Sequence, residues 1–90
     1  MEIRFNPAAS RHGISHARSR FVVEHCTCPL YPADADDEDL IVFLGPDGHG
    51  VALEVMGLEM ADGAILVFHA RKLRRRYLDD YMRVMECQAR

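Results

Sequence analysis

The sequence lacks the features that define several large protein classes. It has no run of 18 apolar residues and no basic segment followed by an apolar leader. We therefore expect neither a membrane span nor secretion, and we expect the protein to be cytoplasmic. It also contains no G-x-S-x-G, Walker, G-x-G-x-x-G or H-E-x-x-H pattern. The chain therefore carries none of the standard hydrolase, nucleotide-binding or zinc-peptidase signatures.

Cysteine is scarce. The three cysteines, Cys26, Cys28 and Cys87, form an odd set. The C-x-C spacing of the first two is that of neither a zinc knuckle nor a redox C-x-x-C motif, so we predict reduced thiols, no metal site and no cofactor.

What the sequence does have is a compact composition with segregated charge. Its 90 residues are 49% hydrophobic and 28% charged, which predicts a single domain over residues 1–90 with an open site. The formal net charge is -3, yet residues 34–39 carry five acids and residues 71–76 carry five bases. A local basic segment in an acidic protein marks a site for a phosphate or carboxylate partner, although a solvated first turn of a helix is the alternative.

Helical signals occupy the two ends of the chain. Asn6 and Pro7 are typical of a short helix start over residues 8–11, and Ser15 is a second N-cap for an amphipathic helix to about Cys26. From Leu73 the apolar residues recur at helical spacing, which predicts a C-terminal helix to about Glu86.

The middle of the chain predicts strands. Apolar segments at 40–45, 50–58 and 64–69 are separated by turn residues at 46–49 and 62–63. We therefore expect an α+β fold with N-terminal helices, a three-stranded or slightly larger antiparallel sheet and a C-terminal helix that packs on it.

The turns also predict which residues face each other. A two-residue turn at Asp62 and Gly63 places Glu54 opposite Arg71 and Met56 opposite His69, and a four-residue turn at 46–49 places Glu54 opposite Ile41. One face then holds the set Ile41, Phe43, Ala52, Glu54, Met56, Leu58, Ile65, Val67, His69 and Arg71. The other, under the helices, holds Leu40, Val42, Leu44, Val51, Leu53, Val55, Leu66 and Phe68. One bulge or register slip would reverse this assignment.

This register brings Glu54, His69 and Arg71 together. RNA cleavage without a metal needs a base for the 2′-hydroxyl, a cation for the phosphorane charge and an acid for the leaving oxygen. Glu54 or His69 is the candidate base. The candidate cations are Arg71, Lys72 and Arg74, and the candidate acids are His69, His49 and Tyr77. The alternative is an ordinary Glu54–Arg71 cross-strand ion pair beside His69, contributing roughly 0.2 to 1 kcal/mol.

Three segments together invite a family comparison. Arg11-His-Gly-Ile-Ser15, a hairpin with Gly50-Val-Ala-Leu53, and Leu66-Val-Phe-His-Ala-Arg-Lys72 before a charged helix resemble the BrnT-type toxins of bacterial type II toxin-antitoxin systems. The resemblance implies a RelE-like fold, metal-independent cleavage of messenger RNA and inhibition by a cognate antitoxin protein. Arg71 and Lys72 match the motif directly, and we expect Lys72, Arg74 and Arg75 to bind RNA.

The chain also departs from that family. His69 stands where the family usually has serine, and Glu38-Asp39 stands where it usually has a Glu-Arg pair. Two other functions stay open. One is a non-catalytic interaction or homodimer domain that uses an apolar sheet face, formed by Ile41, Phe43, Met56, Leu58, Ile65 and Val67. The other is a regulatory domain that binds an anion at residues 71–76.

Overall fold

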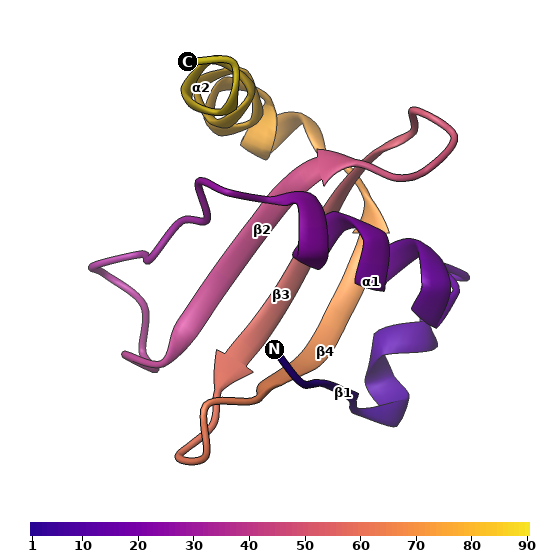
Figure 1. Cartoon of the computed structure of the whole chain (residues 1–90), viewed down its shortest axis with the longest axis vertical. Helices are drawn as coiled ribbons and strands as arrows, with labels where there is room; N and C mark the ends of the chain where they lie inside the picture. Colours follow the sequence, from indigo (N-terminus) through magenta and orange to yellow (C-terminus); the bar gives the residue numbers. More distant parts are fainter.

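The computed structural model describes all residues, 1–90, as a four-stranded mixed sheet packed against two α-helices (Figure 1). The elements in chain order are β1 (Ile3–Phe5), the 3-10 helix η1 (Pro7–Ser10), α1 (His16–His25), β2 (Leu40–Pro46), β3 (Ala52–Glu59), β4 (Ile65–Lys72), the 3-10 helix η2 (Arg75–Tyr77) and α2 (Leu78–Gln88). The predicted α+β class with a C-terminal helix is confirmed. None of the helices has the length and apolar character needed to cross a membrane.

The sheet has the order β1-β4-β3-β2. Strands β2, β3 and β4 form the expected antiparallel meander, but β1 lies parallel to β4. The prediction of a wholly antiparallel sheet was therefore wrong. A three-residue strand is too short to show an alternating pattern, so its pairing depends on the rest of the fold.

Both predicted N-caps are present. The side-chain oxygen of Asn6 accepts a hydrogen bond from the amide of Ala8 at 2.9 Å, and Ser15 Oγ accepts from the amide of Arg18 at 3.2 Å. The first cap starts a 3-10 helix and the second starts α1. The capping chemistry therefore located both starts, although not the type of the first helix.

The C-terminal helix begins later than expected. Strand β4 continues to Lys72, residues 75–77 form a 3-10 turn, and α2 starts only at Leu78. The backbone N–H of Arg74 donates to Glu54 at 2.9 Å, and Arg74 has an extended backbone. This tertiary hydrogen bond prevents a helix from starting at Leu73.

Two predicted β3–β4 pairs at the candidate site are present, but the two-residue turn that predicted them is wrong: Glu59 pairs with Ile65, and the bulge between Met56 and Gly57 restores the predicted pairs. Glu54 pairs with Arg71 and Met56 with His69. Glu54 is not opposite Ile41, however, because it pairs with Leu44. The β2–β3 turn is longer than expected, since the Asp47 carboxylate accepts the amides of His49 and Val51 and closes the loop.

The face assignment was wrong for half of its residues. A β-bulge shifts the β3–β4 register between Met56 and Gly57, and the longer β2–β3 turn changes the pairing of β2. Ile41, Phe43, Ile65 and Val67 consequently lie in the main core with Leu53, Val55 and α1 residues, whereas Val42 and Leu44 share the other face with Met56. The proposed interaction face therefore does not exist as one surface, because four of its six residues are buried in the core.

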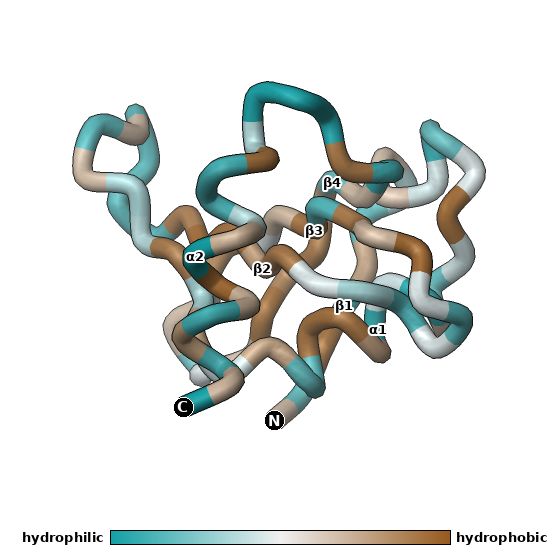
Figure 2. Tube along the Cα trace, turned by 90° about the horizontal axis from the view of Figure 1, so that it is seen from above, coloured by the Kyte–Doolittle hydropathy of each residue, from teal (hydrophilic) through white to brown (hydrophobic).

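The two clusters explain how the helices cover the sheet. The main core includes Val22 and Val23 of α1, and the smaller cluster places Val84 of α2 against Val42 and Leu44. Figure 2 shows α2 at the β2 side of the sheet, with the apolar strands between the helices and the hydrophilic loops outside. On the face of the sheet that α2 covers, the part formed by β3 and β4 carries the polar side chains of Glu54, His69 and Arg71.

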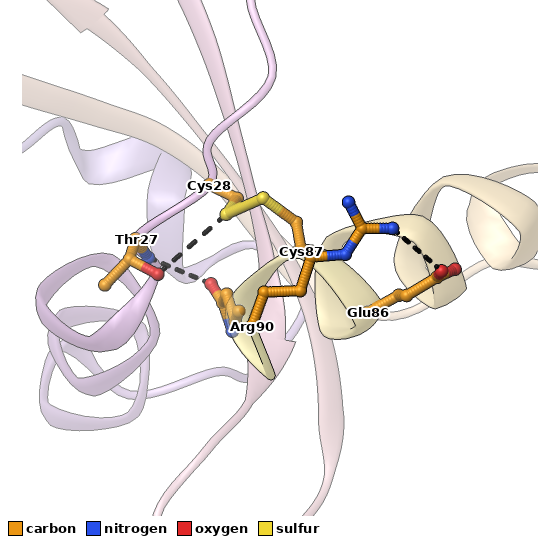
Figure 3. The surroundings of a disulfide bond; sticks show 6 residues. Thr27, Cys28, Glu86, Cys87 and Arg90 are labelled. Carbon is orange, nitrogen blue, oxygen red and sulfur yellow. Dashed lines mark hydrogen bonds and ion pairs between the residues drawn. A yellow bond between two sulfur atoms is a disulfide. The ribbon is translucent and has the colours of Figure 1, made fainter.

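A disulfide joins Cys28 to Cys87, whose Cα atoms are 6.4 Å apart (Figure 3). The prediction of reduced thiols was wrong for these two residues, and only Cys26 is a free thiol. Beside the bond, the amide of Thr27 donates to Gln88 Oε1 at 2.9 Å. The pairing spans 59 residues and depends on α2 ending next to the segment after α1, which spacing alone does not reveal.

Candidate active site

The centre of the site is Glu54, a charged residue with no exposed surface in the middle of β3. Its carboxylate accepts hydrogen bonds from the backbone N–H of Arg74 at 2.9 Å, from Arg74 Nη2 at 2.6 Å and from His69 Nε2 at 3.0 Å. Arg74 Nε lies 3.1 Å from both carboxylate oxygens. A buried charge with this many donors is held in one orientation.

These contacts keep the carboxylate ionised. Burial by itself raises the pKa of Glu54, but the hydrogen bonds from Arg74 and His69 outweigh burial, and the pKa lies below its ordinary value. The same hydrogen bond raises the pKa of Arg74. The pair is therefore a stable anion and cation at neutral pH.

His69 lies beside this anion on the neighbouring strand, and its side chain is 19% exposed. An ionised carboxylate can only accept hydrogen bonds, so Nε2 of His69 is the donor in the contact with Glu54. Nδ1 of His69 is then the ring nitrogen that remains for proton transfer. The predicted proximity of Glu54 and His69 is confirmed, and a carboxylate in this position fixes the tautomer of the imidazole.

A second histidine, His12, lies next to the first. The two ring centroids are 5.6 Å apart and the rings meet at 67°. His12 is exposed in the turn after η1, where Gly13 takes a φ of 76° that favours glycine. The sequence analysis did not include His12 among the candidate site residues, although the Arg11-His-Gly-Ile-Ser15 segment contains it.

The surroundings of His12 favour its neutral form. Desolvation lowers its pKa, and the positive charges of Arg71, His69, Arg11 and Arg74 lower the pKa further, Arg71 foremost among them. A neutral imidazole near two arginines can accept a proton at neutral pH. His12 therefore has the protonation state that a general base requires.

Arg71 has a buried guanidinium nitrogen without a hydrogen-bond partner. Its Cα lies opposite that of Glu54, but its Nε is buried and has no hydrogen-bond acceptor. The expected Glu54–Arg71 ion pair is wrong, because Arg74 takes that place. A buried N–H without an acceptor costs about 1–3 kcal/mol, and a bound anion would remove that cost.

The other predicted residues divide between support and surface. Arg74 holds Glu54 and its guanidinium carbon lies 5.5 Å from the centre of the Tyr77 ring, so we assign it to positioning. Lys72 and Arg75 are exposed and make no ion pair. His49 lies in the turn organised by Asp47 and makes no hydrogen bond to the cluster.

The fold and the site define an α+β domain with a buried carboxylate, two neighbouring imidazoles and an unpaired arginine. No group of three or more His, Cys, Asp or Glu side chains is arranged to hold a metal ion. Comparison with protein-family models, curated proteins and solved structures finds no match for the chain. The functional argument therefore depends on the geometry of His12, Glu54, His69 and Arg71.

Proposed function

We propose that this protein is a metal-independent endoribonuclease, the toxin of a type II toxin-antitoxin system, that cleaves messenger RNA by attack of a 2′-hydroxyl on the adjacent phosphate. The observation that carries the proposal is the pair of imidazoles, His12 and His69, within 5.6 Å of each other beside a buried carboxylate. Two imidazoles supply a base and an acid, and Arg71 supplies the positive charge that the transition state needs.

The proposed step is a transesterification. The 2′-hydroxyl loses its proton to neutral His12, its oxygen forms a bond to phosphorus, and the bond from phosphorus to the 5′ oxygen breaks. His69 takes part as the imidazolium: its Nε2–H stays bonded to Glu54, and its Nδ1–H gives a proton to the departing 5′ oxygen, which leaves His69 neutral and His12 protonated. The products are a 2′,3′-cyclic phosphate and a 5′-hydroxyl, so the atoms balance without water or a metal.

The structure changes the role assigned to Glu54. Because its carboxylate is fully buried and occupied by Arg74 and His69, we assign it as a positioning residue that fixes the tautomer of His69. The sequence-based assignment of Glu54 as the base is replaced by His12. His49 and Tyr77 have no part in the proposed acid step.

The cations serve two purposes. Arg71, with its unpaired Nε, binds the phosphate that reacts. Lys72 and Arg75, both exposed, contact neighbouring phosphates of the RNA and contribute affinity that falls with salt. Arg74 is already paired with Glu54 and acts through it.

The proposal also includes a cognate antitoxin and a cytoplasmic location. Disulfides persist mainly in oxidising compartments, so in a reducing cytoplasm Cys28 and Cys87 would be two thiols. Neither cysteine belongs to the cluster formed by Glu54, His69 and His12. The proposed chemistry therefore operates with the bond formed or broken.

The test is cleavage of a defined single-stranded RNA by the purified chain in the presence of EDTA, with the product ends identified by mass spectrometry. We expect cyclic phosphate ends. Arg71→Ala should slow cleavage by about 10² to 10³-fold, and His12→Gln and His69→Gln should each slow it by about 10² to 10⁴-fold. Expression of the unmutated chain alone should arrest bacterial growth.

A matched control separates this site from general RNA binding. His49→Gln alters an exposed histidine outside the cluster and should leave the rate unchanged, whereas Lys72→Ala should weaken binding and its salt dependence. If folded His12→Gln and His69→Gln variants cleave at the unmutated rate, the site is wrong. If the unmutated chain cuts no RNA and arrests no growth, the function is wrong.

A further inference from the structure

A groove runs along α2 on the side of the segment that follows α1. It consists of two adjoining hollows of about 410 and 290 Å³ that share Leu30 as a wall. The α2 side of the groove is formed by residues 76, 77, 80, 83, 84 and 87, which recur at helical spacing. At 1.5 Å per residue this stripe extends for about 16 Å. We call this feature the α2 groove.

The groove combines an apolar floor with an acidic rim. Leu30, Leu40, Val42 and Met56 line the larger hollow, and its carboxylates come from Asp34, Asp36 and Asp80. Asp34 and Asp36 make no ion pair, and Asp80 has only a 3.6 Å contact with Arg83, whose side chain is 77% exposed. Asp34 and Asp36 therefore carry negative charge that no ion pair within the chain neutralises.

Arg76 lines the larger hollow and Arg83 the smaller one, so the groove holds two guanidinium groups and three carboxylates. The guanidinium carbon of Arg76 lies 5.1 Å from the centre of the Tyr77 ring, and Arg76 forms no ion pair with Asp80. The acidic residues 36–39 follow directly in the chain. The larger hollow, with three carboxylates and one guanidinium group, therefore has an excess of negative charge that attracts a cation.

We propose that the α2 groove binds a short segment of a partner protein that carries apolar side chains and lysines or arginines. The apolar side chains would occupy the floor formed by Leu30, Leu40 and Met56, and the cations would pair with the rim carboxylates. The length of the groove fits about five residues of extended chain. Leu30 already bonds to both the N–H and the C=O of Val42, so the segment binds through side chains rather than as an added strand.

This inference does not rest on the nuclease proposal. It uses the shape and charge of a surface that contains none of His12, His69 or Arg71. The two features meet at Tyr77, which lines the groove and lies beside Arg74, and at Met56, which lines the groove and pairs with His69.

The test uses a fluorescein-labelled eight-residue peptide of alternating leucine and lysine as the probe, with fluorescence polarisation as the readout. We expect saturable binding by the full-length chain. The triple variant Asp34→Asn, Asp36→Asn and Asp80→Asn should weaken it by about tenfold, because three exposed ion pairs are lost. A peptide with serine in place of leucine should not bind, nor should one with glutamate in place of lysine.

The matched control changes the net charge equally but away from the groove. Glu24→Gln, Glu59→Gln and Asp79→Asn alter three exposed acids that line neither hollow, and this variant should bind the peptide normally. Equal weakening of both triple variants would overturn the proposal, because the attraction would then be general. Failure of the unmutated chain to bind the peptide would overturn it too.

Discussion

The Nε2 atom of His69 lies 3.0 Å from the Oε2 atom of Glu54, a carboxylate with no exposed surface. The two residues come from neighbouring strands, and Met56 is the residue directly opposite His69. The contact is therefore diagonal across the sheet, and Arg74 donates to both oxygens of the same carboxylate. A buried anion fixed in this way determines which nitrogen of His69 carries a proton.

Glu54→Gln should lower the free energy of unfolding by about 2 kcal/mol, because Arg74 then loses its charged partner while the side-chain volume is kept. Urea unfolding at pH 7 measures this difference. Glu59→Gln, an exposed change on the same strand, should have little effect. Equal unfolding free energies for all three proteins would show that the buried pair contributes nothing to stability.

The Glu54→Gln variant also tests how the contribution of Glu54 to the free energy of unfolding depends on pH. The folded state lowers the pKa of Glu54 from 4.5, so its stabilising contribution is complete above that value. The contribution is lost as the pH falls through the lower pKa of the folded state. The difference between the unmutated chain and Glu54→Gln should therefore shrink below pH 4.5, and a constant difference would contradict the assignment.

Arg71→Ala should raise the pKa of His12 toward its ordinary value of 6.5. Desolvation is the first cause that lowers this pKa and the charge of Arg71 is the second, so the return is partial. The NMR titration of the His12 ring protons measures it without reference to activity. Lys72→Ala is the control, and an unchanged His12 titration in Arg71→Ala would show that the Arg71 charge does not act on His12.

The Asp47→Asn variant should lose less stability than the unmutated chain when the pH is lowered into the acid range. Hydrogen bonds from the amide of Val51, and then from Arg18 and the amide of His49, lower the pKa of Asp47 from 3.8 to about 2 despite its burial. The carboxylate therefore stabilises the fold fully above pH 3.8 and loses this effect as the pH falls to about 2. Melting temperatures across this range should fall less steeply for Asp47→Asn than for the unmutated chain or Asp79→Asn, and parallel curves would contradict the prediction.

Removing the disulfide with Cys28→Ser and Cys87→Ser should destabilise the protein. Its loop spans 59 residues. In the entropic description, a cross-link over a loop of that length raises the free energy of the unfolded state by about 4 kcal/mol. A reducing agent should destabilise the unmutated chain by a similar amount and leave the double variant unchanged. Cys26→Ser changes a free thiol and is the control; equal stability with and without the bond would show that it does not constrain the unfolded state.

Local patterns in the sequence were sufficient for much of the fold. Ser15 and Asn6 marked two helix starts because capping depends on adjacent residues. Apolar alternation and turn residues located β2, β3 and β4. The assumed two-residue turn at Asp62 and Gly63 is not formed, since Glu59 pairs with Ile65, and the pairing of Glu54 with Arg71 and of Met56 with His69 agrees with the prediction only because the bulge between Met56 and Gly57 shifts the register back by one residue.

The tertiary structure decided how these pieces combine into a site. A turn closed by Asp47 and one bulge changed which residues share a face. Arg74, rather than Arg71, neutralises Glu54 because the chain after β4 folds back over the carboxylate. His12 joins His69 from a distant turn, and Cys28 joins Cys87. Such contacts depend on the relative positions of elements far apart in the chain, which local propensity and periodicity do not encode.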